Sequence, residues 1–163
     1  MPPDGGLRDR LIHENIFRAV KAELTTLGWF DPGREHQPLR MIDEFPDENQ
    51  DVPFNTLAVS MGDAGGVPTE LGSKLEDFEV IFFIDFFAEN DGVGRHVRGD
   101  IAHFLKGAEM LPITDYSDPL EPVVFSVEIQ DDIDLRKPER AVQKFQKHWY
   151  VLSFTVIDYG RPH

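Results

Sequence analysis

The residue types best suited to chemistry occur together in the middle of the chain. Segment 92–97 reads GVGRHV, and it follows an apolar run and opens a helical pattern, which is the setting of a dinucleotide-binding glycine loop. The third small residue of such a loop is replaced here by Val97. Acidic residues also precede the segment, and they would lie beside the pyrophosphate of a bound dinucleotide. The sequence therefore favours a structural role, in which Gly92 and Gly94 form a tight turn between a strand and a helix.

A second candidate is the trio His96, Asp100 and His103, which share one side of the same predicted helix. Two imidazoles and a carboxylate can bind Zn²⁺ or Fe²⁺. The first and last of them are seven residues apart, however, which spans about two helical turns, or roughly 10 Å. The acidic cluster 131–134 lacks the glycine and final glutamate of a calcium loop. We expect no catalytic, cofactor-binding or metal-binding site, and therefore no enzyme.

Composition limits the partners of the chain. The net charge of −14 disfavours tight binding to nucleic acid or to an anionic membrane, because affinity for phosphate comes from Lys and Arg. The chain has no Cys, so disulfides and thiolate chemistry are excluded. No stretch approaches 18 uncharged apolar residues, and we expect no membrane partner.

The element that must organise the rest is the apolar run 78–88, which predicts a long strand. One face would present Phe78, Val80, Phe82, Ile84 and Phe86. The other would present Glu79, Ile81, Phe83, Asp85 and Phe87. A strand that is apolar on both faces is central, or is covered by another element or another subunit. Apolar residues at helical spacing then predict a helix over 93–105 that ends near Gly107.

Similar patterns place the other elements. An apolar stripe over 12–27 predicts a first helix with Arg8 on its exposed side, and strands are expected at 39–45, 57–61, 123–129 and 148–158. Segments 62–73, 108–121 and 131–144 are interpreted as a long hairpin loop and two connectors. The prediction is one α+β domain over residues 1–163, with two main helices and a mostly antiparallel sheet of about five strands in the order α-β-β-β-α-β-β.

Two stretches resemble the tail terminator family of bacteriophages with long, non-contractile tails. They are VPFNTLAVSMGD, residues 52–63, and ELGSKLEDFEVIFFIDFFAENDGVGRHVRGDIAHFLKG, residues 70–107. The similarity lies in a leading helix, a hairpin with a loose tip, a long strand of the FxxDFYAE type, a helix ending in LxG, and two closing strands. It covers the central part of the chain in detail and the flanks only in the order of elements.

The resemblance implies a structural virion protein. Six copies would form a homo-oligomeric ring that caps the tail tube, stops its elongation and provides the surface that the filled head joins. The implied partners are the tail tube protein and a head-completion or neck protein, and DNA would pass through an acidic lumen without specific binding. The implied location is the virion tail at the head–tail junction, after assembly in the host cytoplasm.

Two groups of residues are candidates for the assembly interface. The first lies in the predicted hairpin loop, and the second on the further face of the central strand, where the first helix could equally cover it. The candidates are Gly65, Gly66, Val67, Pro68, Leu71, Ile81, Phe83 and Phe87. Two alternatives stay open: another neck or tail-completion ring protein of the same fold, and a small nucleotide- or ligand-binding enzyme domain.

Overall fold

The computed structural model describes residues 5–47, 52–68, 75–138 and 148–162. In this part of the chain it contains two helices and seven strands, which makes an α+β protein as expected, with more strands than the predicted five. The elements are α1 (Gly5–Thr26), β1 (Arg40–Ile42), β2 (Thr56–Pro68), β3 (Leu75–Ala88), α2 (Asp91–Gly107), β4 (Met110–Thr114), β5 (Val123–Ile129), β6 (Asp134–Arg136) and β7 (His148–Pro162).

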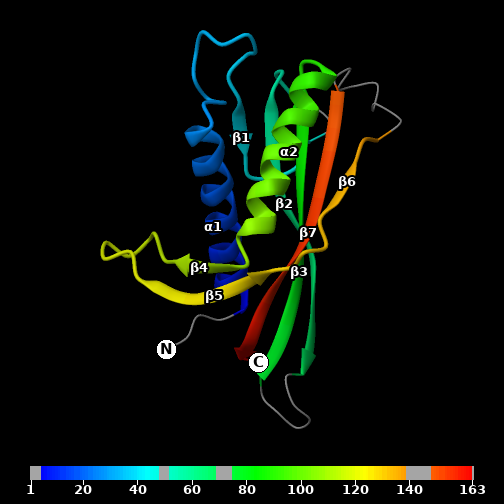
Figure 1. The fold of residues 1–163 in the computed structure, drawn as a ribbon. Helices are drawn as coiled ribbons and strands as arrows, with labels where there is room; N and C mark the ends of the chain where they lie inside the picture. Colours follow the sequence, from blue (N-terminus) through cyan, green and yellow to red (C-terminus); the bar gives the residue numbers. More distant parts are fainter. Residues whose placement is uncertain (1–4, 48–51, 69–74, 139–147, 163) are drawn as a thin grey trace.

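Three long strands, β2, β3 and β7, form the centre of the sheet (Figure 1). The strand order is β1-β2-β3-β7-β5-β4, and β6 pairs with β7 beside β5. All pairs are antiparallel except β1 with β2, so the sheet is mixed with an antiparallel majority. The predicted central strand is therefore central, because β3 pairs with β2 on one side and β7 on the other.

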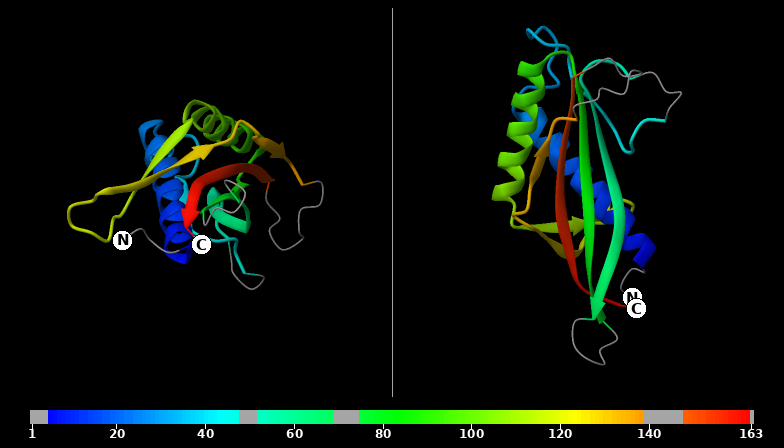
Figure 2. Two further views of the ribbon diagram at one scale, coloured as in Figure 1. Left: turned by 90° about the horizontal axis from the view of Figure 1, so that it is seen from below. Right: turned by 90° about the vertical axis from the view of Figure 1, so that its right-hand side faces the viewer.

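Both helices lie on one face of this sheet (Figure 2). That face holds most of the buried apolar side chains, including Phe82 and Phe154, whose rings stack at 5.5 Å between centroids. On α1, His13 Nε2 lies 2.8 Å from the carbonyl oxygen of Val59 in β2. Burial of this face between helices and sheet forms the core of the molecule.

Helix α1 also contributes a buried charge that its sequence pattern does not indicate. The helical spacing predicts Arg8 on the exposed side, but its Nη2 and Nε donate to the two carboxylate oxygens of Asp158 in β7, at 2.6 and 2.9 Å. Both side chains are buried, and the Arg8 guanidinium lies 3.8 Å from the ring centre of Phe125. A bidentate pair of this kind satisfies a charge that is costly to bury alone.

The glycines of segment 92–97 lie inside α2 and do not form the predicted turn. The helix begins at Asp91, after Asn90, whose side chain accepts a hydrogen bond from Val93 N at 2.9 Å. Gly94 is buried where α2 meets β7, and a Cβ at this position would overlap the ring of Tyr150. Gly94 is thus required by close helix–sheet packing.

Strand β2 is longer than predicted, because the backbone of 62–68 continues the sheet. Gly65 is paired with Glu79 and Pro68 with Glu76, after a register shift between Met61 and Ala64. Glycine lowers the intrinsic strand preference of this segment, and pairing with the long β3 overrides it. The rest of the predicted loop, 69–73, lies outside the described residues.

Strands β4 and β6 lie where the sequence pattern predicts connectors. β4 contains Pro112 and β6 has three residues, so neither shows the usual strand pattern. β4 and β5 form an arm that extends past α1 (Figure 1). Asn15 on α1 holds the arm, because its side-chain amide both accepts from Thr114 N and donates to Thr114 O at 2.9 Å.

Candidate assembly surface

The sheet has a second face, opposite the helices, which we call the open face (Figure 2). Direct cross-strand partners show that its side chains come from β2, β3 and β7. Its residues are Thr56, Ala58, Ser60, Glu79, Ile81, Phe83, Asp85, Phe87, Trp149, Val151, Ser153, Thr155 and Ile157. Since α1 packs on the other face, the idea that the first helix covers Ile81 and Phe83 is wrong.

One end of the open face is covered by the chain itself. Phe87 has 0% exposure and packs with Val52 and Trp149, and its ring centroid lies 6.0 Å from that of Trp149. Phe45 adds a further ring 6.1 Å from Phe87. Phe87 is therefore core, which corrects its place among the candidate interface residues.

The middle of the open face is only partly covered by the residues that the structure describes. Ile81 is 42% exposed and Phe83 is 37% exposed, although both lie on the central strand of the sheet. Their cross-strand partners on β7 are Thr155 and Ser153, which are too small to shield them. Two large apolar side chains on a central strand are thus partly exposed side by side, which makes this patch the candidate contact for another chain.

Carboxylates border this patch. Glu79 is exposed at one end of it and shares a row with Ile157 of β7 and Glu128 of β5. Glu128 accepts a hydrogen bond from the Tyr159 hydroxyl, and this bond is the main reason why the pKa of Tyr159 is raised. At the side, Asp134 lies in the row of Ser153 and is paired with Arg136 at 2.7 Å. The patch is thus apolar in the middle, with Glu79 and Glu128 at one end and the Asp134–Arg136 pair at the side.

A buried carboxylate lies where the covered and uncovered parts of the open face meet. Asp85 is 4% exposed, and its Oδ1 accepts a hydrogen bond from Trp149 Nε1 at 2.9 Å. Burial raises its pKa to about 6, because the charged form loses water, and the Trp149 bond offsets part of that rise. Sequence alternation indicates the face on which Asp85 lies and gives no sign of its burial.

The outward side of α2 has the opposite charge. Its exposed side chains include Arg95, His96, His103 and Lys106, which we call the outer strip of α2. Neither Arg95 nor Lys106 forms an ion pair with another described residue. Of the two acidic residues of α2, Asp91 binds Lys137 at 2.5 Å, and Asp100 accepts a hydrogen bond from Trp29 and lies 3.8 Å from His96. The Lys137 bond, with one from the Tyr150 hydroxyl, lowers the pKa of Asp91.

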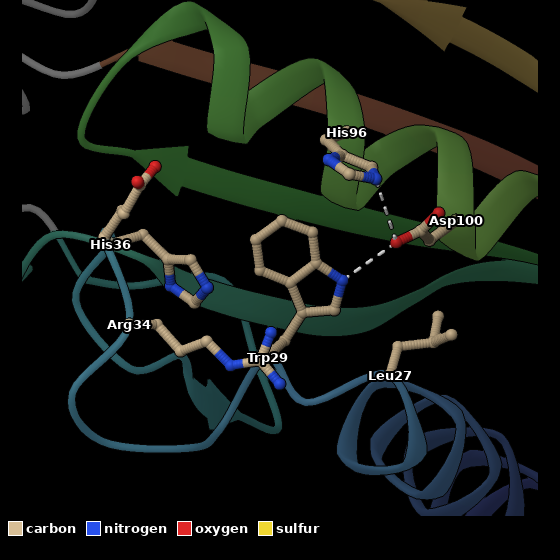
Figure 3. A pocket seen from close by; sticks show the side chains of 7 residues that line it. Leu27, Trp29, Arg34, His36, His96 and Asp100 are labelled. Atoms are coloured by element: carbon tan, nitrogen blue, oxygen red, sulfur yellow. Dashed lines mark hydrogen bonds and ion pairs between the residues drawn. The ribbon is translucent and has the colours of Figure 1, made fainter.

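Two residues of the predicted trio on α2, His96 and Asp100, lie together at a hollow (Figure 3). Asp100 Oδ2 accepts a hydrogen bond from Trp29 Nε1 at 2.8 Å, and His96 Nε2 lies 3.8 Å from the same oxygen. These residues, with Arg34 and His36, line a hollow of about 430 Å³. His103 is exposed and does not line it. In the described part of the chain no three His, Asp or Glu side chains are grouped as metal ligands.

The remaining candidate residues are placed only by their backbone. Gly65, Gly66, Val67 and Pro68 belong to β2 and pair with β3, while Leu71 lies outside the described residues. Sequence reasoning missed the outer strip of α2, although its signal is present as basic residues at helical spacing on the side opposite Val97 and Ile101.

Comparison with known proteins assigns no family. No family model matches the sequence, and no curated protein matches it. Within the described residues, neither helix is long and apolar enough to cross a membrane.

Proposed function

We propose that this protein is a structural subunit that assembles into a ring at the end of a bacteriophage tail, as a tail terminator. It caps the tail tube, stops its elongation and provides the head-joining surface. The observation that supports this most is the open face, where Ile81 and Phe83 remain exposed on the central strand. A face of this kind suits burial against another chain.

Charge supports the same proposal. A closed ring joins copies through two different surfaces, and this chain presents an apolar patch with Glu79 and Glu128 at one end and a basic strip on different elements. A net charge of −14 per copy suits a lumen through which DNA passes, because like charge keeps the phosphates from binding. The partners in this proposal are the tail tube protein and a head-completion or neck protein.

The proposal also places the protein in the virion, after assembly in the host cytoplasm. A neck or tail-completion ring protein of the same fold is the nearest alternative, since the open face would serve it equally. Tail tubes assembled with and without the protein separate the two: a terminator fixes tube length, whereas a neck protein leaves length unchanged and is required only for head joining.

The first test is the solution mass of the purified protein by light scattering, with negative-stain images of the same sample. We expect closed rings near six copies. Ile81→Ser with Phe83→Ser should abolish them, because the apolar patch loses most of its burial energy, about 2 kcal/mol per side chain. Leu120→Ser, at an 88% exposed position on the β4–β5 arm, is the matched control and should leave rings intact.

If the purified protein is strictly monomeric, the next measurement is made on mixtures with tube protein, where the ring should form on the tube end. Rings that persist in the Ile81→Ser, Phe83→Ser variant would show that the open face is not the contact. Tubes of normal length without the protein would contradict the terminator role itself.

A ligand-binding domain is the second candidate, favoured by the hollow around Trp29. It combines the aromatic side chain of Trp29 with His36, His96 and a carboxylate, which are polar groups that can orient a small molecule. A thermal shift with nucleotides or divalent metals that is lost in Trp29→Leu would support this candidate.

A further inference from the structure

The open face and helix α2 lie on opposite sides of the sheet (Figure 2). Glu79 and Glu128 border the apolar patch on one side, and Arg95 and Lys106 are exposed on the other. A surface that attracts its complement but not itself favours a head-to-tail contact over a two-fold one.

We propose that the open face of one copy binds the outer strip of α2 of the next copy. This rests on the proposed function in one respect, that copies of the chain associate. A second copy of this chain thus covers the patch around Ile81 and Phe83, and it does so with its helix α2. Such a contact repeats around a ring when each step adds the same rotation, and that rotation sets the number of copies.

The arrangement of elements indicates which part of α2 takes part. β3 and α2 run in opposite directions, and α2 ends about halfway along β3 (Figure 1). In a ring whose axis runs along the strands, rotation brings each residue of one copy to the same height along the axis in the next copy. The exposed residues at the middle of β3, Ile81 and Phe83, therefore face the C-terminal half of the neighbouring α2, where His103 and Lys106 are exposed.

Each surface carries one charged residue that is available for a contact between copies. In the described part of the chain, Lys106 forms no ion pair, and Glu79 forms none. Near Phe83 the basic residues Arg136 and Lys137 are already paired, with Asp134 and Asp91 respectively. Glu79 is therefore the unpaired charge that a neighbouring copy meets at this end of the patch.

Introduced cysteines test the pairing, because the chain has none of its own. Glu79→Cys and Lys106→Cys are prepared as separate variants, mixed in equal amounts and oxidised with a mild reagent. A disulfide requires the two Cα atoms to come within about 7 Å, so a heterodimer forms only if these surfaces meet. The matched control mixes Glu79→Cys with Lys21→Cys, which places the second thiol at an exposed cationic position on α1.

We expect about tenfold more heterodimer than in the control, since a preformed contact raises the effective thiol concentration. The double variant should give a ladder of covalent oligomers that ends at the ring size.

Homodimers of Glu79→Cys alone would show a two-fold contact and overturn the pairing. Absence of any disulfide in a sample whose light-scattering mass shows rings would overturn the pairing while leaving the ring. Absence of both rings and disulfides, with and without tube protein, would overturn the proposed function as well.

Charge reversal gives a second readout that does not depend on thiol geometry. Lys106→Glu should weaken assembly about tenfold, because like charges then face each other across the contact. Adding Glu79→Lys in the same chain should restore it. A double variant as weak as Lys106→Glu alone would contradict a contact between these two residues.

Discussion

Asp85 is the residue whose chemistry departs most from its surroundings. It lies 4% exposed on the central strand, with Trp149 Nε1 as its hydrogen-bond donor, and burial raises its pKa to about 6. In the unfolded chain the same carboxyl has its ordinary pKa of 3.8. The folded state therefore binds this proton more tightly than the unfolded state does, and the contribution of Asp85 to stability falls as the pH rises from about 4 through about 6.

Asp85→Asn should remove that pH dependence. At pH 8 the variant should be more stable than the wild type by about 2 kcal/mol, since a shift of this size is worth about 1.4 kcal/mol per pH unit and an amide still costs some desolvation. At pH 4 the two proteins should be similar. The measurement is urea denaturation at both pH values on dilute protein, taking the difference between the chains so that the other carboxylates cancel.

Trp149→Phe is the control for this assignment. It removes the hydrogen bond that lowers the pKa of Asp85, so the loss of stability should still begin near pH 4 and should extend to higher pH than in the wild type. Equal pH slopes in the wild type and the Asp85→Asn variant would show that this carboxyl is not the group responsible.

At the level of elements, the position of α2 depends on one close approach. Gly94 brings the first turn of the helix against Tyr150 of β7, while a Cβ added at Gly99, further along the helix, would have nothing within 4 Å. The two glycines share a helix and a residue type, and they differ only in what lies beside them. Alanine substitutions at these two positions therefore distinguish the effect of packing against the sheet from the effect of helix propensity.

Gly94→Ala should destabilise the protein by about 3 kcal/mol, because the new methyl group overlaps the Tyr150 ring and forces the helix away from the sheet. Gly99→Ala should stabilise it by about 0.5–1 kcal/mol, through the lower entropy of the unfolded chain and better helix propensity. Denaturation midpoints of the two variants against the wild type measure both effects. A Gly94→Ala variant as stable as Gly99→Ala would contradict the close approach of α2 and β7.

At the level of the whole molecule, two small groups of opposite charge lie on different layers: Glu79 and Glu128 beside the open face, and Arg95 and Lys106 on the outer strip of α2. Because the layers are different, one copy cannot neutralise itself at these positions (Figure 2). The association of copies that we propose through these surfaces has an electrostatic part, which salt screens, and an apolar part around Ile81 and Phe83, which salt does not weaken.

Assembly should therefore weaken as ionic strength rises. Between about 0.05 and 0.5 M NaCl we expect the association constant to fall about tenfold, because the screening length shrinks from about 14 Å to about 4 Å. Light scattering over a concentration series at each salt gives the constant. Assembly that strengthens with salt would indicate a contact that is apolar throughout, and Lys106→Glu in the same series should show a smaller salt effect than the wild type.

The sequence by itself determined the elements whose side-chain periodicity is strong. The alternation in 78–88 and the helical spacing in 93–105 predict β3 and α2, and the α+β class follows from their order. It also placed Ile81, Phe83 and Phe87 on one face, since alternation is a local property of the chain. Short or proline-containing strands such as β4 and β6 were not predicted, because pairing with neighbouring strands, and not their own sequence pattern, makes them strands.

Only the tertiary structure decided which residues of that face are exposed. Phe87 is buried because Val52 and Trp149 reach it from distant parts of the chain, whereas Ile81 and Phe83 have the small Thr155 and Ser153 as their partners on β7. Arg8 is buried because Asp158, 150 residues away, supplies its counter-charge. The physical reason is the same in each case: periodicity fixes the direction of a side chain, and contacts between residues far apart in sequence fix what covers it.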